Sequence, residues 1–253
     1  MGLFDFFKGK GGKAGTGTGN TERPRASDKN VARFSDAISK KAQNYDRQEA
    51  LEGLAKIGSA EAATALLKRY TFVVDPSITD QEEKETAFRG IVSAGKDALP
   101  AIREFCVKAD SVTWPLRMMR ELLSDEDYVG EILAMLEKWD TEYARNADPK
   151  IQLISALEEI KDPRTVEGVT RFLEDVNEPT RFHAVTTLLA QDSAVAAAPL
   201  ARALVREEAN RTINRIAEGL AMRAWPIPEA DRAGVDDKLP RGYRLDDDGR
   251  VAR

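Results

Sequence analysis

Apolar residues recur at three- and four-residue intervals along most of the chain, a spacing that places them on one face of an α-helix. Ala50, Leu51, Leu54 and Ile57 are a clear example, and a Gly-Ser pair at 58–59 ends that pattern. Alternation with period two, which would indicate β-strands, is nearly absent. The pattern predicts an all-α protein.

The predicted helices come in pairs. Corresponding first helices begin near residues 46, 79, 113, 148, 178 and 209, with steps of 30 to 35 residues. A repeat of this length indicates a stacked architecture, because one helix pair cannot bury its apolar face alone. The helix at 209–225 has no clear second half. We therefore expect about five pairs, preceded by a helix at 28–43 that is either part of a repeat or an N-terminal cap.

Short motifs at the helix starts carry a family resemblance. The sequence reads DP at 148–149, DPR at 162–164 and EPTR at 178–181, each followed by Ala and Leu at helical intervals. These segments resemble HEAT repeats of the bacterial type first associated with phycobilisome lyases. The resemblance is good over 148–207, fair over 46–140 and absent in both tails. It implies a right-handed α-solenoid whose first helices line the convex side and whose second helices line the concave side.

The N-terminal region, 1–27, differs from the repeats. It starts with an apolar-aromatic tip, and a Gly-, Thr- and Pro-rich stretch that predicts a flexible linker follows. The tip consists of Leu3, Phe4, Phe6 and Phe7. Such a segment could contact a membrane surface or a groove of a partner. The alternatives are a terminus that does little, or one that folds back onto the chain's first helices.

The C-terminal region, 226–253, also lacks the repeat pattern. Three prolines interrupt its first half, and Asp248-Gly249 then stands between two short extended segments. We expect an irregular cap that contains a small hairpin and covers the end of the solenoid 28–225.

Composition narrows the functional class. Of the 253 residues 42% are hydrophobic and 32% are charged, and the charges are interspersed, which is typical of a soluble helical protein. No apolar run approaches the ~18–20 residues needed to span a bilayer. With one cysteine, an internal disulfide is impossible, and the start MGLFDFFKGK lacks the features of a secretory signal. We expect a cytoplasmic protein.

The sequence offers little material for an active site. His183 is the only histidine, which excludes a His-based metal site, and Cys106 on an apolar helix is most simply a small core residue. The stretch GKAGTGTGN lacks the flanking strand and the ending of a phosphate-binding loop. We expect no catalytic residues, no metal, no cofactor and no enzymatic activity.

Two enzymatic alternatives stay open. One is a chromophore lyase-like protein, suggested by the family resemblance alone. The other is a DNA-repair glycosylase, for which aromatic, acidic and basic side chains would have to gather on the concave face. The candidates are Asp110, Trp114, Arg117, Arg120 and Trp139. Against the second alternative, the net charge is −5 and the repeats carry no basic excess to attract phosphates.

Basic residues on the second helices are the candidates for partner binding. They form a mixed stripe that could face an acidic protein, although ordinary solvated side chains would give the same pattern. The members are Lys68, Arg69, Arg103, Lys138, Arg171, Arg202 and Arg206. We therefore expect a scaffold or adaptor that binds a protein on the concave face, with the N-terminal tip as a tethered second contact. Nucleic acid is not an expected partner.

Overall fold

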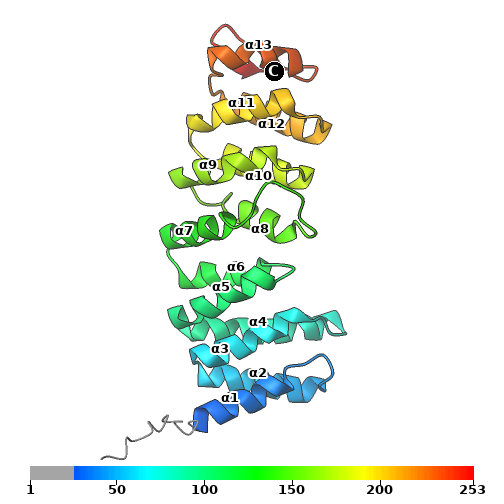
Figure 1. Cartoon of the computed structure of the whole chain (residues 1–253), viewed down its shortest axis with the longest axis vertical. Coiled ribbons are helices and arrows are strands. Elements are labelled where there is room, and N and C mark those ends of the chain that lie inside the picture. Colours follow the sequence, from blue (N-terminus) through cyan, green and yellow to red (C-terminus); the bar gives the residue numbers. More distant parts are fainter. Residues whose placement is uncertain (1–25) are drawn as a thin grey trace, which may run out of the picture.

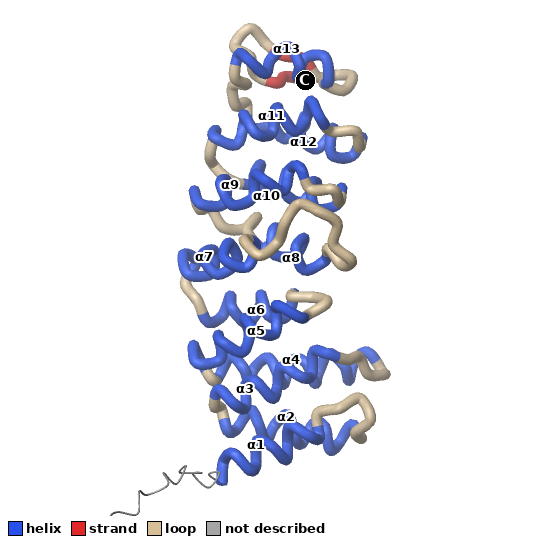
Figure 2. The backbone as a smooth tube through the Cα atoms, viewed as in Figure 1, coloured by secondary structure: helices blue, strands red, loops and turns tan. Residues whose placement is uncertain are grey.

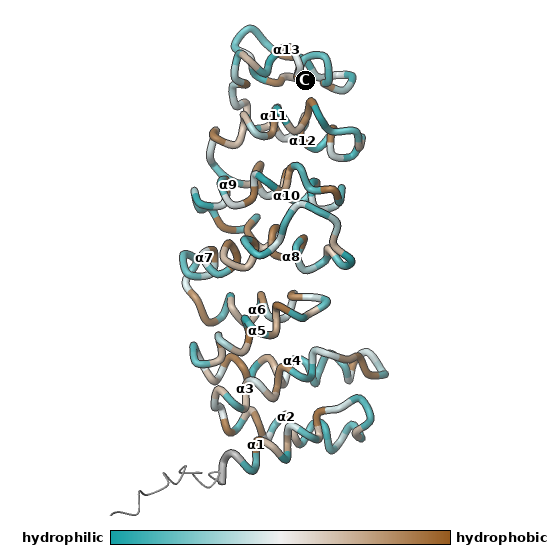
Figure 3. Tube along the Cα trace, viewed as in Figure 1, coloured by the Kyte–Doolittle hydropathy of each residue, from teal (hydrophilic) through white to brown (hydrophobic). Residues whose placement is uncertain are grey.

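The computed structural model describes residues 26–253, and this part of the chain is mostly helical (Figure 2). The helices stack along one long axis, with α1 at one end and the C-terminus at the other (Figure 1). The expected all-α solenoid of helix pairs is confirmed. Hydrophobic and hydrophilic stretches alternate along each helix, as expected for elements that bury one face (Figure 3).

The first half of the stack contains α1 and three helix pairs. Its elements are α1 (Ala26–Ala37), α2 (Asn44–Ile57), α3 (Ala60–Leu67), the 3-10 turn η1 (Lys68–Thr71), α4 (Ser77–Ser93), η2 (Gly95–Ala98), α5 (Leu99–Lys108), α6 (Thr113–Leu122) and α7 (Asp125–Leu136). The second half contains α8 (Asp148–Ala156), α9 (Pro163–Thr170), η3 (Arg171–Glu174), α10 (Glu178–Ala190), η4 (Ala194–Ala196), α11 (Ala197–Arg206), α12 (Asn210–Arg223) and α13 (Glu229–Lys238).

The pairs form two columns. First helices contact first helices of the next pair, as in α2 with α4, α8 with α10 and α10 with α12, whereas second helices contact second helices, as in α3 with α5 and α11 with α13. We call the outer surfaces of these columns the first-helix face and the second-helix face. Between them runs a continuous apolar core that includes Leu54, Ile91, Ile132 and Leu188.

Gly90 shows how closely the helices of the first two pairs approach. A Cβ atom at this position of α4 would lie 2.7 Å from a methyl carbon of Leu66 and 2.8 Å from the Cβ atom of Ala55. Both distances are shorter than carbon atoms tolerate, so the contact between α4 and the first pair requires glycine here.

A buried ionic network joins the first two pairs. Arg47 of α2 donates two hydrogen bonds to Glu83 of α4, at 2.7 and 2.8 Å, and Arg69 of η1 donates a third at 2.6 Å. Arg69 also reaches Asp80 at 2.7 Å, and Lys84 reaches the other oxygen of that carboxylate at 2.6 Å. The side chain of Glu83 is 2% exposed, so its charge depends on these two arginines.

Related ion pairs occur within later pairs. Lys150 of α8 bonds Asp175, which follows η3, and both side chains are fully buried. Arg181 of α10 makes a bidentate contact, with both distances 2.8 Å, to Glu207 at the end of α11. In each case a basic side chain near the start of the first helix pairs with an acidic side chain that follows the second helix. The ion pair thereby links the two helices of the pair at one end.

The C-terminal end differs from the expectation in one respect. The helix α12 is followed by another helix, α13, within the region expected to be irregular, and α13 packs on α11. The prolines bound this helix and do not break it, because Pro228 is its N-cap and Pro240 follows its C-cap. The expected hairpin is present as β1 (Arg244–Leu245) paired with β2 (Val251–Ala252).

Removal of the negative charge at the centre of the network should destabilise the stack. Glu83→Gln leaves Arg47 and Arg69 buried without their shared carboxylate, so we expect the free energy of unfolding to fall by about 3–5 kcal/mol. Glu82→Gln, an exposed neighbour on the same helix, should change it by no more than about 0.5 kcal/mol. Urea unfolding followed by circular dichroism measures both. Equal midpoints for the two variants would contradict the account.

The network should also make stability depend on pH. Burial opposes ionisation of Asp80, but hydrogen bonds from Lys84, Arg69 and the Val74 amide outweigh it and lower the pKa to about 2. Because the folded pKa lies below the free value of 3.8, this stabilisation is complete above about pH 5 and is lost as pH falls toward 2. Its size is about 2 kcal/mol.

Asp80→Asn provides the test of this pH dependence. We expect the variant to be less stable than the native chain at pH 6, and the difference in free energy of unfolding to shrink as the pH is lowered from 5 to 2.5. Urea midpoints at each pH give the comparison. A difference that stays constant over this range would contradict the assignment.

Candidate functional site

The 3-10 turn η1 directs its residues to opposite sides. Arg69 points inward to the ionic network, with its side chain 0% exposed. Lys68, Tyr70 and Thr71 instead line a groove on the second-helix face. One short turn therefore connects the buried charges of the stack to its outer surface.

The groove lies between the neighbouring second helices α3 and α5, and we call it the α3–α5 groove. Its volume is about 670 Å³. Leu67, Tyr70, Pro100, Ala101, Phe105 and Ala109 supply apolar surface, whereas Thr64, Lys68, Thr71, Glu104, Lys108, Asp110 and Ser111 supply polar groups. The lining spans residues 64–71 on one side and 100–111 on the other, and the part on α5, 100–108, is about 12 Å of helix.

Aromatic contacts hold the inner wall of the groove. The ring of Tyr70 lies 6.5 Å from that of Phe105 in an edge-on arrangement and 5.3 Å from that of Trp114. The Tyr70 hydroxyl donates to the carbonyl oxygen of Lys84 at 2.7 Å. Burial, and then the charge of Glu85, raises the pKa of Tyr70, so the hydroxyl remains a neutral donor. The inner wall is therefore aromatic and uncharged.

This lining suits a short protein segment. Concave sites with an apolar floor and a few polar groups at the edge are the usual form of binding sites, and those for small ligands measure about 300–1,000 Å³. The rim carries both signs of charge, since Lys108 lies 3.7 Å from Glu104. A segment with a few apolar side chains and flanking charges would fit both features.

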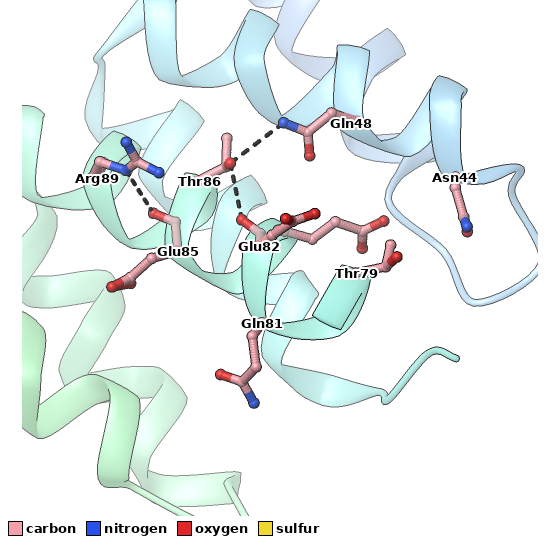
Figure 4. A pocket seen from close by; sticks show the side chains of 9 residues that line it. Asn44, Gln48, Thr79, Gln81, Glu82, Glu85, Thr86 and Arg89 are labelled. Carbon is pink, nitrogen blue, oxygen red and sulfur yellow. Dashed lines mark hydrogen bonds between the residues drawn. The ribbon is translucent and has the colours of Figure 1, made fainter. Parts of the chain in front are cut away.

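A second groove, on the first-helix face, is different in character. It lies between α2 and α4, has a volume of about 580 Å³ and is lined by polar side chains such as Gln48, Glu82, Glu85 and Thr86 (Figure 4). Gln48 donates to the Thr86 hydroxyl at 3.3 Å, which joins the two helices across it. Because its lining is already solvated or internally bonded, it offers less apolar area to a partner.

The single histidine takes part in a third groove. His183 of α10 is half-buried, and its Nδ1 atom lies 2.8 Å from the hydroxyl of Ser155 on α8. In Ser-His-acid triads the serine faces Nε2, and Nδ1 faces the carboxylate. This contact therefore occupies the wrong nitrogen for a triad and acts as a link between two first helices.

The predicted basic stripe is used mainly between layers. Arg103 of α5 pairs with Glu131 of α7, Arg206 of α11 pairs with Glu174 of η3 at 2.8 Å, and Arg202 lies 3.7 Å from Asp231 of α13. Three of the contacts along the second-helix column thus include a surface ion pair. Because most of these arginines are already paired with acidic residues, they do not form a continuous row of free positive charges for a partner.

The remaining members of the stripe behave individually. Lys68 donates to the Ser35 hydroxyl of α1 at 2.5 Å, Arg171 donates to the Leu136 carbonyl at 2.5 Å, and exposed Lys138 lines a small cavity beside Trp139. For Arg69 the expectation of a surface position is wrong. Two carboxylates draw its guanidinium into the core, where helical spacing alone would have placed it outside.

The residues considered for a glycosylase are dispersed. Trp114 packs against Tyr70 and Phe88, with the Arg117 guanidinium 4.3 Å above its ring, whereas Trp139 lines a separate cavity of about 220 Å³. Asp110 lies at the rim of the α3–α5 groove. Arg120 pairs with Asp125 at 2.6 Å. The structure does not bring these side chains together in one groove.

Other expectations concern residues outside the described part of the chain. The tip residues Leu3, Phe4, Phe6 and Phe7 all lie before residue 26. Over 26–253, no group of three His, Cys, Asp or Glu side chains is arranged to hold a metal ion. None of the helices in that range combines the length and apolar character needed to cross a membrane.

Sequence reasoning missed the groove itself. The helical spacing of Tyr70 and Phe105 predicts inward-facing side chains, but both are only half-buried and line the groove. The available signal was the small pair Pro100-Ala101 on α5, which leaves space beside α3. That signal has meaning only when the register between the two helices is known.

The architecture defines the class of this protein: it is an α-solenoid of stacked helix pairs. The first pair also matches a family model, that of the PBS lyase HEAT-like repeat, over residues 46–70. This range covers α2, α3 and the start of η1, so the expected resemblance at the level of the repeat is confirmed. It lies outside 148–207, where the motifs look most regular. Among curated proteins, none matches the chain.

The environment of Cys106 leads to a test of the local packing. Burial raises the pKa of its thiol to about 12, and the thiolate is the reactive form. At pH 8 we expect iodoacetamide to modify the native chain about 10³-fold more slowly than the urea-unfolded chain, as the ratio of thiolate fractions predicts. Mass spectrometry of the alkylated peptide gives the rates. Similar rates in both states would contradict the half-buried position of Cys106.

Proposed function

We propose that this protein is a non-enzymatic scaffold or adaptor of the cytoplasm that binds a protein partner on its second-helix face. The α3–α5 groove is the observation that supports this proposal most directly. It presents half-buried aromatic and aliphatic side chains on the face that the HEAT resemblance places on the concave side. Helical repeats of this type generally mediate protein interactions.

The groove would act as the anchor of the interface. Apolar side chains of the partner insert between α3 and α5 against Tyr70 and Phe105, and charged groups at their flanks meet the mixed rim. The rest of the second-helix face extends the contact along the stack. Because interlayer ion pairs occupy most of the basic stripe, apolar burial would supply more of the affinity than net charge does.

The N-terminal tip would provide a second contact once the partner is bound. A tethered segment needs little affinity of its own, because the first contact raises its local concentration to about the millimolar range. The combination of an anchoring groove and a tethered segment would give the adaptor selectivity for partners that offer both surfaces.

Photo-crosslinking from the groove tests the proposal. With p-benzoylphenylalanine in place of Phe105, irradiation of cells that express the full chain should give a discrete crosslinked product that contains another protein. The same amino acid in place of Glu82, on the polar first-helix groove, is the control and should give at least tenfold less. A second change, Ala101→Glu, puts charge into the groove floor and should remove the product.

Two results would overturn this assignment of the site. One is an equal crosslinking yield from both positions, which would show only general proximity. The other is a product from the groove position that persists after Ala101→Glu, which would show that the groove does not hold the partner.

A further inference from the structure

The α3–α5 groove leaves apolar surface open to solvent at the end of the stack where the N-terminal segment begins. Ala101 and Phe105 of α5 and Ala109, which follows it, are each only half-buried there, and Pro100 is exposed. Contiguous apolar surface that is open to solvent can mark an interaction site. The question is what covers it when no partner is bound.

The first helix places the N-terminal segment beside the groove. Lys68, at the groove edge, donates to Ser35 of α1, and α1 packs on both α2 and α3. Ala26, where the described chain begins, is nine residues before Ser35, or about 14 Å along the helix. The edge of the groove at Lys68 is therefore separated from Ala26 by these 14 Å of helix and one side-chain contact.

The preceding sequence is long enough to bridge a separation of this size. Residues 8–25 separate the tip from Ala26, and they lie outside the described part of the chain. Eighteen residues rich in Gly and Thr have an expected r.m.s. end-to-end distance of about 23 Å. Effective concentration is highest when the tether length matches the distance to be bridged. A tip at the end of a tether of this length would reach the groove.

The chemistry of the tip complements the lining. Leu3, Phe4, Phe6 and Phe7 offer aliphatic and aromatic side chains, which pack well against the rings of Tyr70 and Phe105. Asp5 and Lys8 add one charge of each sign, and the rim likewise offers Lys108 and Glu104. If extended, residues 3–7 measure about 13 Å, close to the length of the groove.

We infer that residues 3–7 of this chain occupy its own α3–α5 groove and that a partner must displace them. The inference rests on the proposed function, because it names an internal ligand for the same groove. At an effective concentration of about 1 mM, a tip with a dissociation constant of about 0.1 mM fills the groove about 90% of the time. Displacement frees the tip for its second contact.

A peptide of residues 1–12, labelled with fluorescein at its C-terminal end, tests the inference by fluorescence polarisation. The receptor is the full chain with Phe4→Ser, Phe6→Ser and Phe7→Ser, which disables its own tip. We expect a dissociation constant of about 0.1 mM for this receptor. The native chain should bind the peptide about tenfold more weakly, because its own tip competes.

Matched variants locate the binding site. Ala101→Glu in the tip-disabled chain should weaken peptide binding at least tenfold, whereas Ala134→Glu, an exposed alanine on α7 of the same face, should leave it unchanged. Melting temperatures within about 2 °C of each other show that both variants are folded. Equal affinity for the native and tip-disabled chains, equal effects of the two glutamates, or no saturable binding up to 1 mM would each overturn the inference.

Self-association is the remaining alternative. A concentration-dependent dimer of the native chain in sedimentation velocity, lost in the tip-disabled chain, would place the tip in a second copy and overturn the internal contact. The inference and the proposed function fail separately. If the peptide does not bind but the groove position still crosslinks to another protein, only the inference fails. If the peptide binds but no such crosslinked product forms, the proposed partner site fails.

Discussion

The desolvation of one carboxylate constrains the N-terminal half of this solenoid. A buried charge is tolerated only when it is paired and hydrogen-bonded, and Glu83 meets that requirement with guanidinium groups from two other elements. Arg47 and Arg69 must therefore converge on α4, which fixes how α2 and η1 sit against it. Because Lys68, Tyr70 and Thr71 share the short turn with Arg69, the position of the groove wall follows from the same constraint.

Later helix pairs also contain ion pairs between a basic and an acidic side chain, but these ion pairs connect different elements. Lys150 with Asp175, and Arg181 with Glu207, close an edge within a single pair, whereas Glu83 joins two pairs. The second-helix column adds surface ion pairs between neighbours, which contribute less because water screens them. A solenoid is stabilised by nearest-neighbour contacts, so local differences of this kind set which layers are most firmly joined. The groove lies beside the most heavily charged of these junctions.

Much of the fold could be predicted from the sequence. Apolar spacing predicted every helix from α1 to α12, and the period of 30 to 35 residues predicted their stacking. The helix α13 was missed because the prolines on both sides of 229–238 resemble a break, whereas they are the boundaries of this helix. The candidate site was predicted less well. Arg69 has the spacing of a surface residue, and its burial depends on Glu83 and Asp80 from another helix. The groove depends on the register between α3 and α5. The sequence pattern of either helix alone does not indicate that register.

The central claim is that the buried network holds the groove wall in place, and hydrogen exchange tests it most directly. Exchange of the backbone amides can be compared between the native chain and Glu83→Gln under conditions where both remain folded. The account predicts faster exchange in residues 68–74, with the amides of α10 and α12 unchanged. Unchanged exchange in 68–74, or an increase spread evenly along the stack, would contradict it.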